Sequence, residues 1–472
     1  MLLFLPETIL LVLIVVLLCL TLKPKADSAK SINSFMVIVG FVVLLGTYTS
    51  LSGSGTLFSE TYRVDLFSQG FKLILALAFL CVVVLSALSI SIAERKTLEY
   101  YIFLCSATLG MMMLTSSSNI LSLYVSLELS SYSLYILSGL KQDRRSAESG
   151  VKYLIFGAAT SGLLLWGLSL IAGLAGTTSL IQIAKAAPML SNEPAFMLGL
   201  FFVTISFLFK LSGFPAHFWA PDVYESSASS VTAFIATASK AAAVAILIRF
   251  FLIAGVSANF SAALGILAFI SMTLGNCVAL VQQDVKRLLA YSSIAQAGYI
   301  LVGLLSGSAE GYSSSLFYAL AYVLMNTAAF VVVLLVSKDA GHDNPQLSHF
   351  DGLAERAPFF ALVLLLSLLS LAGIPPLVGF TGKWILFTAA MEKGHWFLVL
   401  WGVLNSVVSL FYYLTLVKHA YLEKSKNPNP IAVPKPIKLL GLILFCALIL
   451  LGIFPNQVIT FAQQAISSAV WS

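Results

Sequence analysis

The stretch Phe209-Lys210-Leu211-Ser212-Gly213-Phe214-Pro215 decides the fold of this 472-residue chain, because it interrupts an apolar run from within. A second stretch, Leu371-Ala372-Gly373-Ile374-Pro375-Pro376, repeats the pattern 160 residues later. Proline removes a backbone donor and clashes with the preceding helical turn, and glycine weakens the helix beside it. Each stretch therefore predicts a helix that is broken in its middle. The residues at the predicted breaks are Gly213, Pro215, Gly373, Pro375 and Pro376.

Both stretches lie in a chain with the composition of an integral membrane protein. Hydrophobic residues make up 59% of it and charged residues only 10%, against about 25% charged residues in soluble domains. Apolar runs recur that are long enough to cross about 30 Å of hydrocarbon. Because lipid offers the backbone no hydrogen-bond partner, we expect an all-α fold. The fourteen predicted spans are 2–22, 33–52, 67–92, 98–115, 118–140, 149–175, 196–220, 229–254, 260–281, 285–306, 313–337, 357–391, 395–419 and 436–464.

Basic residues are unequally distributed over the loops that join these spans. Loops after odd-numbered spans, counted with the three residues of each span that adjoin them, hold 17 lysines and arginines, and loops after even-numbered spans hold 3. The positive-inside rule then places the odd loops in the cytoplasm and both termini outside. The alternation also supports the number fourteen, because a miscounted span would scramble it.

The two broken spans, the seventh and the twelfth, are five spans apart and so cross the membrane in opposite directions. This is the signature of an inverted repeat, although Gly-Pro kinks are also common in membrane helices. We expect three N-terminal spans in 1–97 and a first repeat of spans four to eight in 98–254. A second repeat of spans nine to thirteen is expected in 260–419, and a C-terminal span in 436–472.

Four ionisable residues lie near mid-membrane depth in these spans: Glu128, Lys210, Lys240 and Lys383. An ionisable group at the bilayer centre costs from about 3 to over 10 kcal/mol, so four of them indicate a function. Lysine can release its proton, whereas arginine cannot. We expect Glu128 and Lys210 to form an ion pair, and Lys240 to accept a proton when that pair loosens. Lys383 would pass it toward the opposite face. The alternative is that each charge is a static tie between helices.

Three further residues are open to two interpretations each. Lys152 lies four residues after Glu148, so a surface ion pair and a relay role are both possible. His217 could relay protons or cap the broken backbone. Lys286 could take part in the relay or serve as an anchor at the membrane interface.

The remaining polar residues indicate no other chemistry. Lys72 and Arg249 lie within reach of span ends and are expected to snorkel. The five cysteines show no CxxC spacing, so no metal site is expected. His342 and His349 fall in a polar loop and are expected to be solvated.

Three stretches of the chain, 209–224, 284–293 and 372–383, resemble the antiporter-like membrane subunits of respiratory complex I, the proton-translocating NADH:quinone oxidoreductase. The context Leu127-Glu128-Leu129 and Lys383 resemble the subunit N group of that family. The resemblance covers nearly the whole chain. It implies fourteen helices, two inverted five-helix half-channels and proton pumping driven by distant quinone reduction.

The resemblance also assigns roles to residues. The family's proton path runs through a glutamate and four lysines, which by resemblance are Glu128, Lys152, Lys210, Lys240 and Lys383. Many relatives have a histidine near Gln296. Glutamine cannot titrate, so here that side chain can only orient water or form hydrogen bonds.

The expected setting of the chain follows from the same resemblance. We find no Gly-x-Gly-x-x-Gly motif, flavin site or cluster ligands, so FMN, iron–sulfur clusters and quinone are expected on partner subunits and no cofactor on this chain. The expected partners are the other membrane subunits, the hydrophilic redox arm and the lipid of a bacterial inner membrane, with no nucleic acid. The alternatives are a subunit of a sodium/proton antiporter, a ferredoxin- or hydrogenase-linked proton pump, and a passive scaffold.

Overall fold

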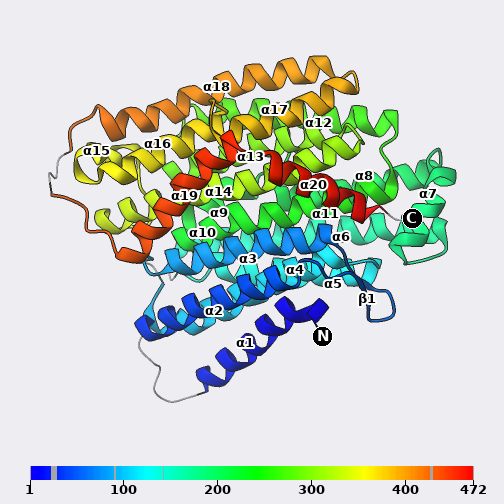
Figure 1. The fold of residues 1–472 in the computed structure, drawn as a ribbon, viewed down its shortest axis with the longest axis horizontal. Helices are drawn as coiled ribbons and strands as arrows, with labels where there is room; N and C mark the ends of the chain where they lie inside the picture. The colour runs from blue at the N-terminus through cyan, green and yellow to red at the C-terminus, as the bar shows by residue number, and fades with distance from the viewer. Residues whose placement is uncertain (1, 23–28, 90–91, 142, 426–428, 471–472) are drawn as a thin grey trace.

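The computed structural model describes residues 2–22, 29–89, 92–141, 143–425 and 429–470. These residues form a bundle of helices that lie side by side along one direction, with a small two-stranded hairpin at one end (Figure 1). Three lysines of the odd-numbered loops, Lys23, Lys25 and Lys426, lie outside the described residues.

The helices before the first break are α1 (Leu5–Thr21), α2 (Ala29–Thr49), α3 (Leu66–Ser86), α4 (Thr97–Ser116), α5 (Ile120–Ser138), α6 (Arg144–Ala175), α7 (Leu180–Leu190) and α8 (Pro194–Leu211). The helices after it are α9 (Trp219–Ser226), α10 (Ser229–Phe234), α11 (Lys240–Ala254), α12 (Ala258–Ala279), α13 (Val285–Leu304), α14 (Ala309–Ala340), α15 (Leu353–Arg356), α16 (Pro358–Ala372), α17 (Val378–Glu392), α18 (Trp396–Tyr421), α19 (Lys435–Ile453) and α20 (Asn456–Ala469). The antiparallel hairpin consists of β1 (Gly55–Leu57) and β2 (Tyr62–Val64).

Helix length and composition confirm the all-α, multi-pass membrane class. Within the described ranges, 11 helical segments are long and apolar enough to cross a membrane. The number fourteen and the inverted repeat stay predictions. In the segment Ser229–Ala254, which holds Lys240, every residue of an apolar 18-residue stretch is buried, whereas in α6 and α19 the buried share of such a stretch is 28%. Lys240 therefore lies in the centre of the bundle, and α6 and α19 lie on its outside.

Both predicted interruptions are present. α8 ends at Leu211, where Ser212 takes a left-handed φ of 56°, and helical structure resumes at Trp219. α16 ends at Ala372, where Gly373 has a φ of 91°, a conformation that glycine adopts readily. The last carbonyls of each broken helix thus lack donors from the following turn.

Two other predicted spans are not continuous helices. The span predicted at 436–464 divides, because α19 ends at Ile453 and α20 begins at Asn456. Pro455 lies between them and cannot donate the hydrogen bond that would continue α19. The span predicted at 229–254 contains a π-helical turn, η3 (Ile235–Ser239), directly before Lys240. A π turn adds a residue to the helix and often occurs at functional sites.

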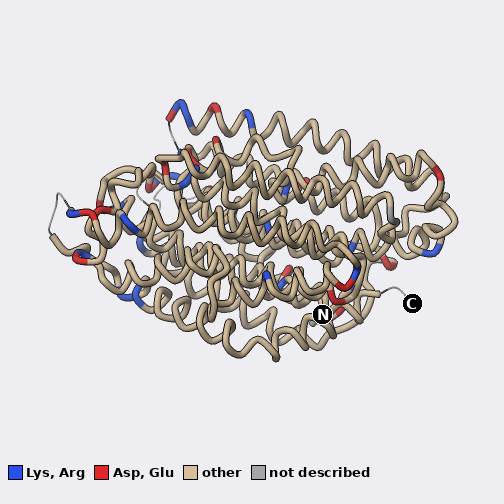
Figure 2. Tube along the Cα trace, turned by 90° about the horizontal axis from the view of Figure 1, so that it is seen from above, with Lys and Arg blue, Asp and Glu red and all other residues tan. Residues whose placement is uncertain are grey.

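The charged residues lie mostly at the two ends of the bundle. Figure 2 shows lysines and arginines gathered chiefly toward its left end, while both chain termini lie toward the right. The hairpin and α7, which the sequence did not predict, also lie at the right end in Figure 1. The basic end and the end with the termini are therefore opposite, as the charge asymmetry of the loops predicts.

Two glycines allow pairs of helices to approach closely. A Cβ atom on Gly110 of α4 would lie 2.6 Å from the backbone nitrogen of Ser130 on α5. A Cβ atom on Gly275 of α12 would lie 2.5 Å from the backbone nitrogen of Ala295 on α13. The offset between the two glycines is 165 residues, and the same offset relates the two residues that they contact. The two helix pairs are therefore packed in an equivalent way.

We expect Gly110→Ala and Gly275→Ala each to destabilise the protein by about 1–3 kcal/mol, because the added methyl group forces two backbones apart. Gly162→Ala is the matched control, since a Cβ atom there meets nothing within 4 Å. Thermal unfolding of the purified assembly in detergent, followed by size-exclusion chromatography, measures the difference. Equal tolerance of all three substitutions would contradict the close packing of these helices.

Candidate functional site

Glu128 and Lys210 lie in the same part of the bundle but do not form the predicted ion pair. Glu128 on α5 accepts a hydrogen bond of 2.5 Å from the Ser161 hydroxyl of α6. Lys210, at the end of α8, donates to the hydroxyls of Ser130 and Ser131 on α5, at 3.3 Å to the latter. Each of the two charged groups is therefore bonded to serine hydroxyls instead of to the other. The sequence pattern did not reveal this, because serines are common in membrane helices.

A small cavity lies beside Lys210, and Glu128 does not line it. It has a volume of about 10 Å³ and is lined by Ser131, Ser161 and Lys210, among others. This is close to the smallest volume that holds one water molecule, and the lining supplies the polar partners that such a water needs. Hydroxyls that both donate and accept can carry a proton along this cavity to the ammonium group.

Lys240 binds the carbonyl end of the first broken helix. Its Nζ donates to the Ser212 hydroxyl and lies 3.4 Å from the carbonyl oxygen of Lys210. It also lies 5.0 Å from the centre of the Trp219 ring. The C-terminal end of a helix carries partial negative charge, which favours a cation. The break thus provides a binding site for a buried ammonium group that is only 1% exposed.

Lys383 binds the carbonyl end of the second broken helix in a similar manner. Its Nζ donates to the carbonyl oxygen of Ala372 and to the Ser406 hydroxyl, both at 3.1 Å. It lies 4.1 Å from the centre of the Tyr299 ring. Each break therefore presents a helix-terminal carbonyl, and each carbonyl binds a lysine that also contacts a serine and an aromatic ring.

Hydroxyl and amide groups on α13 lie between the two lysine sites. Tyr224 donates to Ser293 at 3.4 Å, and Ser292 is hydrogen-bonded to Tyr413. Gln296 accepts a hydrogen bond from Tyr318 and donates to the carbonyl oxygen of Leu371, at 3.0 Å. Gln296 thus forms hydrogen bonds beside the second break, as a side chain that cannot titrate is expected to do.

The three residues with two interpretations have different surroundings. Lys152 has 46% of its side chain exposed and pairs with Glu148 at 3.0 Å and with Asp222 at 3.3 Å. The predicted surface pair with Glu148 is thus present, and the structure does not bring Lys152 against the other relay lysines. Lys286 is fully buried and donates to the carbonyl oxygen of Ser227 at 2.8 Å, so it is not an exposed anchor.

His217 is buried directly after the first break. Its ring packs against Phe214 and Phe218, with ring centres 5.8 and 4.2 Å away. Its Nδ1 atom has no hydrogen-bond partner among the described residues. In the polar loop, His342 and His349 contact each other, with their Nε2 atoms 3.3 Å apart. Burial and the neighbouring His342 lower the pKa of His349.

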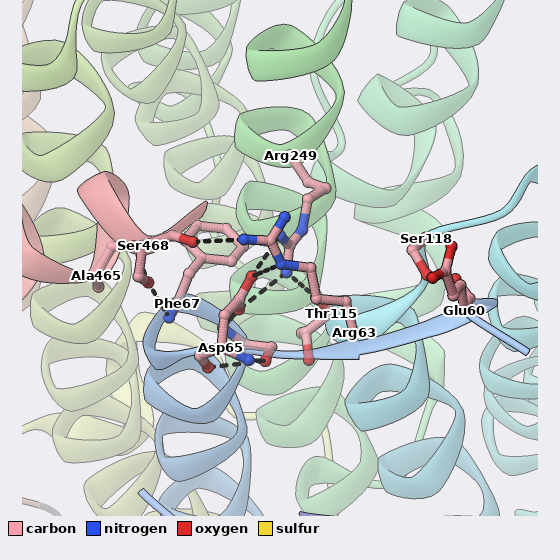
Figure 3. Close-up of polar contacts among 10 residues, drawn as sticks. Glu60, Arg63, Asp65, Phe67, Thr115, Ser118, Arg249, Ala465 and Ser468 are labelled. Atoms are coloured by element: carbon pink, nitrogen blue, oxygen red, sulfur yellow. Dashed lines mark hydrogen bonds and ion pairs between the residues drawn. The ribbon is translucent and has the colours of Figure 1, made fainter. Parts of the chain in front are cut away.

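A group of buried charges near the hairpin was not predicted from the sequence. Arg249 of α11 binds Asp65, the N-cap of α3, through two contacts of 2.7 and 3.1 Å (Figure 3). Lys72 of α3 lies 2.9 Å from Glu7 of α1, and both side chains are 0% exposed. The snorkelling predicted for Lys72 and Arg249 is therefore wrong, because acidic partners from distant segments hold both side chains inside the protein.

No group of three or more histidine, cysteine, aspartate or glutamate side chains that could hold a metal ion occurs in the described parts of the chain. The relay candidates are lysines, a glutamate and hydroxyl groups, a set suited to moving protons. The arrangement comprises two helix breaks, a lysine bound at each, and polar side chains between them.

Comparisons with known proteins agree with this geometry. A family model described as NADH:quinone oxidoreductase/Mrp antiporter, TM, matches residues 117–409. The chain is 43% identical to NADH-quinone oxidoreductase subunit N 2 of Syntrophobacter fumaroxidans over 98% of each chain. It is 37% identical to NADH-quinone oxidoreductase subunit N of Trichlorobacter lovleyi, over 98% of this chain and 96% of that one.

Solved structures show the same fold. A chain of respiratory complex I from Thermus thermophilus with bound Aureothin is 32% identical, with a TM-score of 0.84 over 96% of this chain and 98% of that chain. A chain of the Mrp complex from Dietzia has a TM-score of 0.88 over 99% of this chain and 97% of that one, at 19% identity. At that identity the likeness concerns the fold alone.

Proposed function

Because the chain belongs to the NADH:quinone oxidoreductase/Mrp antiporter family of membrane proteins, we propose that it is the proton-translocating membrane subunit of an NADH:quinone oxidoreductase. Its relatives of 37–43% identity over nearly their whole length carry the name subunit N. The chain would move protons across a bacterial inner membrane while electrons pass from NADH to quinone on partner subunits.

The pair of lysine-binding helix breaks carries this proposal. Lys240 and Lys383 each occupy the carbonyl end of a broken helix, buried to 1% and 4% exposure. A static tie between helices does not require a titratable group, and arginine would supply a better hydrogen-bond donor. Lysine at both breaks instead suits a path in which each site gains and loses a proton.

The contacts suggest how the first half of the path works. Lys210 and Lys240 lie close together, since the ammonium group of Lys240 approaches the backbone carbonyl of Lys210. Two like charges at this distance repel each other, so a proton on one ammonium group favours release from the other. The negative charge of Glu128 on α5 opposes this repulsion. When Glu128 moves toward Lys210, it favours a proton on Lys210 and therefore release of the proton from Lys240. When Glu128 moves away, Lys240 takes up a proton.

The second half of the path would run from Lys240 to Lys383 through the hydroxyls near α13. The Gln296 side chain does not titrate, but it accepts a hydrogen bond from Tyr318 and so fixes the tyrosine beside the break. Lys152 and Lys286 would lie at the approach to the path rather than within it. His217 would exchange a proton with water entering at the first break, since its buried Nδ1 has no other partner in the described chain.

We also propose that the chain consists of two inverted repeats, 98–254 and 260–419, flanked by helices in 1–97 and 436–472. The equivalent close packing at Gly110 and Gly275, at a constant offset of 165 residues, supports this division. The basic end of the bundle would face the cytoplasm and both termini the periplasm. The direction of proton flow does not follow from this orientation.

The partner subunits would supply the energy. Moving one proton against 100 mV costs about 2.3 kcal/mol, and this chain has no flavin or nucleotide motif in its sequence with which to obtain it. FMN, iron–sulfur clusters and quinone would be bound by the hydrophilic arm and the adjoining membrane subunits. A sodium/proton antiporter complex is the second candidate, because the Mrp complex shares the fold.

Copurification tests this function. With an affinity tag on this chain, the purified assembly is expected to oxidise NADH with a quinone as acceptor. When it is reconstituted in vesicles, NADH addition is expected to acidify one compartment. Recovery of a complex that exchanges sodium for protons and does not oxidise NADH would instead support the antiporter assignment.

A further inference from the structure

A second set of buried charges lies outside the relay, at the end of the bundle that carries the hairpin. It comprises Glu7, Asp65, Lys72 and Arg249, contributed by α1, the N-cap of α3, α3 itself and α11, and their side chains are at most 5% exposed. Figure 3 shows the part around Asp65 and Arg249. Nothing in the proposed relay uses these four groups.

The Asp65–Arg249 pair is fixed. The guanidinium group makes two contacts with the carboxylate, donates to the carbonyl oxygen of Thr115 at 3.0 Å and lies 4.8 Å from the centre of the Phe67 ring. The carboxylate also accepts from the backbone nitrogen of Ser68 at 2.8 Å. Since arginine does not deprotonate in proteins, this pair ties helices together and cannot exchange a proton.

The Glu7–Lys72 pair has a different environment. The ammonium group approaches Oε1 of Glu7 at 2.9 Å, and the Tyr62 hydroxyl donates to the same oxygen at 2.6 Å. Oε2 of Glu7 has no hydrogen-bond partner in the described chain, and neither amide atom of the fully buried Gln69 has one. Nζ of Lys72 lies at ion-pair distance from Oε1 but makes no well-aligned hydrogen bond there. Buried polar atoms are normally satisfied by protein or by internal water. The surroundings of this pair are therefore polar and only partly satisfied by the protein.

We propose that Glu7 and Lys72 form a proton-exchange site separate from the relay. A proton passes from Nζ of Lys72 to Glu7, so that an N–H bond breaks and an O–H bond forms. The ammonium–carboxylate pair becomes an amine and a carboxylic acid, with no change in net charge. In an apolar interior the two forms are much closer in free energy than in water, because desolvation penalises the charged form.

Charged and aromatic groups surround the Glu7–Lys72 pair. Asp65 and Arg249 are the other charged groups that act on Lys72, and they act in opposite senses. Asp65 is also paired with Arg63 at 3.5 Å. Tyr62 is the group that links Glu7 to the hairpin, where Phe4 and Phe58 pack edge-on against the tyrosine ring. Beside the hairpin is an open hollow of about 540 Å³ lined by Arg63 and Asp65. Neither Tyr62 nor Glu7 lines this hollow, so the exchange takes place within the buried pair.

Infrared difference spectroscopy of the purified assembly tests the site, because a carboxylic acid and a carboxylate absorb at different frequencies. We expect the native protein to show a carboxylic-acid band from Glu7. In Lys72→Met this band should be stronger, because the carboxylic acid is the form of Glu7 that leaves no unpaired charge in the apolar interior. In Glu7→Gln/Lys72→Met that band should be lost, with both charges removed so that no buried charge is left without a partner.

The control is Glu60→Gln, which removes an exposed carboxylate of the hairpin and should leave the band unchanged. Identical carboxylic-acid bands in the native protein and in Glu7→Gln/Lys72→Met would overturn the proposal, because Glu7 would then never receive the proton of Lys72. The measurement follows one side chain and does not require the chain to pump, so its outcome is independent of the proposed function.

Discussion

Replacing Lys240 by arginine is expected to stop proton translocation through this chain although the positive charge is kept. Arginine can still donate to the Ser212 hydroxyl and to the carbonyl of Lys210, the two groups that bind Lys240 now. It cannot release its proton. Loss of a group that transfers a proton typically slows the step by roughly 100-fold or more. Lys240→Met, which removes charge and hydrogen bonds together, should be no worse than Lys240→Arg.

The measurement compares protons moved per NADH oxidised in vesicles that contain the assembled complex. Lys393→Arg is the matched control, because Lys393 is exposed in a loop and should tolerate the same exchange. If Lys240→Arg pumped like the native protein while Lys240→Met failed, Lys240 would be a static tie between α11 and the broken helix. The relay would then have to bypass it.

The parts of the site that the sequence predicted depend on local signals. Glycine and proline break a helix wherever they stand together, so the ends of α8 and α16 followed directly from 213–215 and 373–376. A lysine within an apolar run has to be buried or paired, so Lys240 and Lys383 could be identified without knowing the fold. The carbonyl that each of them binds could not, because it belongs to another helix.

The parts that the sequence missed depend on residues far apart in the chain. Arg249 and Asp65 are 184 residues apart, and no pattern along one helix indicates that they meet. The π turn before Lys240 contains neither glycine nor proline, so nothing in 235–239 marks it. The ion pair predicted between Glu128 and Lys210 is absent, because Glu128 instead bonds to a serine hydroxyl of α6 and Lys210 to serine hydroxyls of α5.

The Asp65–Arg249 pair leads to the second large expected effect. Replacing Arg249 by methionine leaves the Asp65 carboxylate, 4% exposed, without its main partner. Removing one member of a buried ion pair destabilises a protein by about 3–5 kcal/mol, and we expect a loss of this size. The position also joins α11 to α3 and α4, so the loss should spread to the contacts of the N-terminal helices with the rest of the bundle.

A second substitution separates the charge effect from the loss of packing. Asp65→Asn keeps an N-cap side chain that can accept from the Ser68 backbone and removes the buried charge, so Arg249→Met/Asp65→Asn should recover most of the stability that Arg249→Met loses. Arg287→Met is the matched control, because Arg287 and its partner Asp222 are 29% and 37% exposed, and such pairs contribute at most about 1 kcal/mol. Denaturant titration of the purified assembly measures all three. If the double variant were as unstable as Arg249→Met, the methylene groups of Arg249 packed in the core would account for the loss, and the buried charge of Asp65 would not.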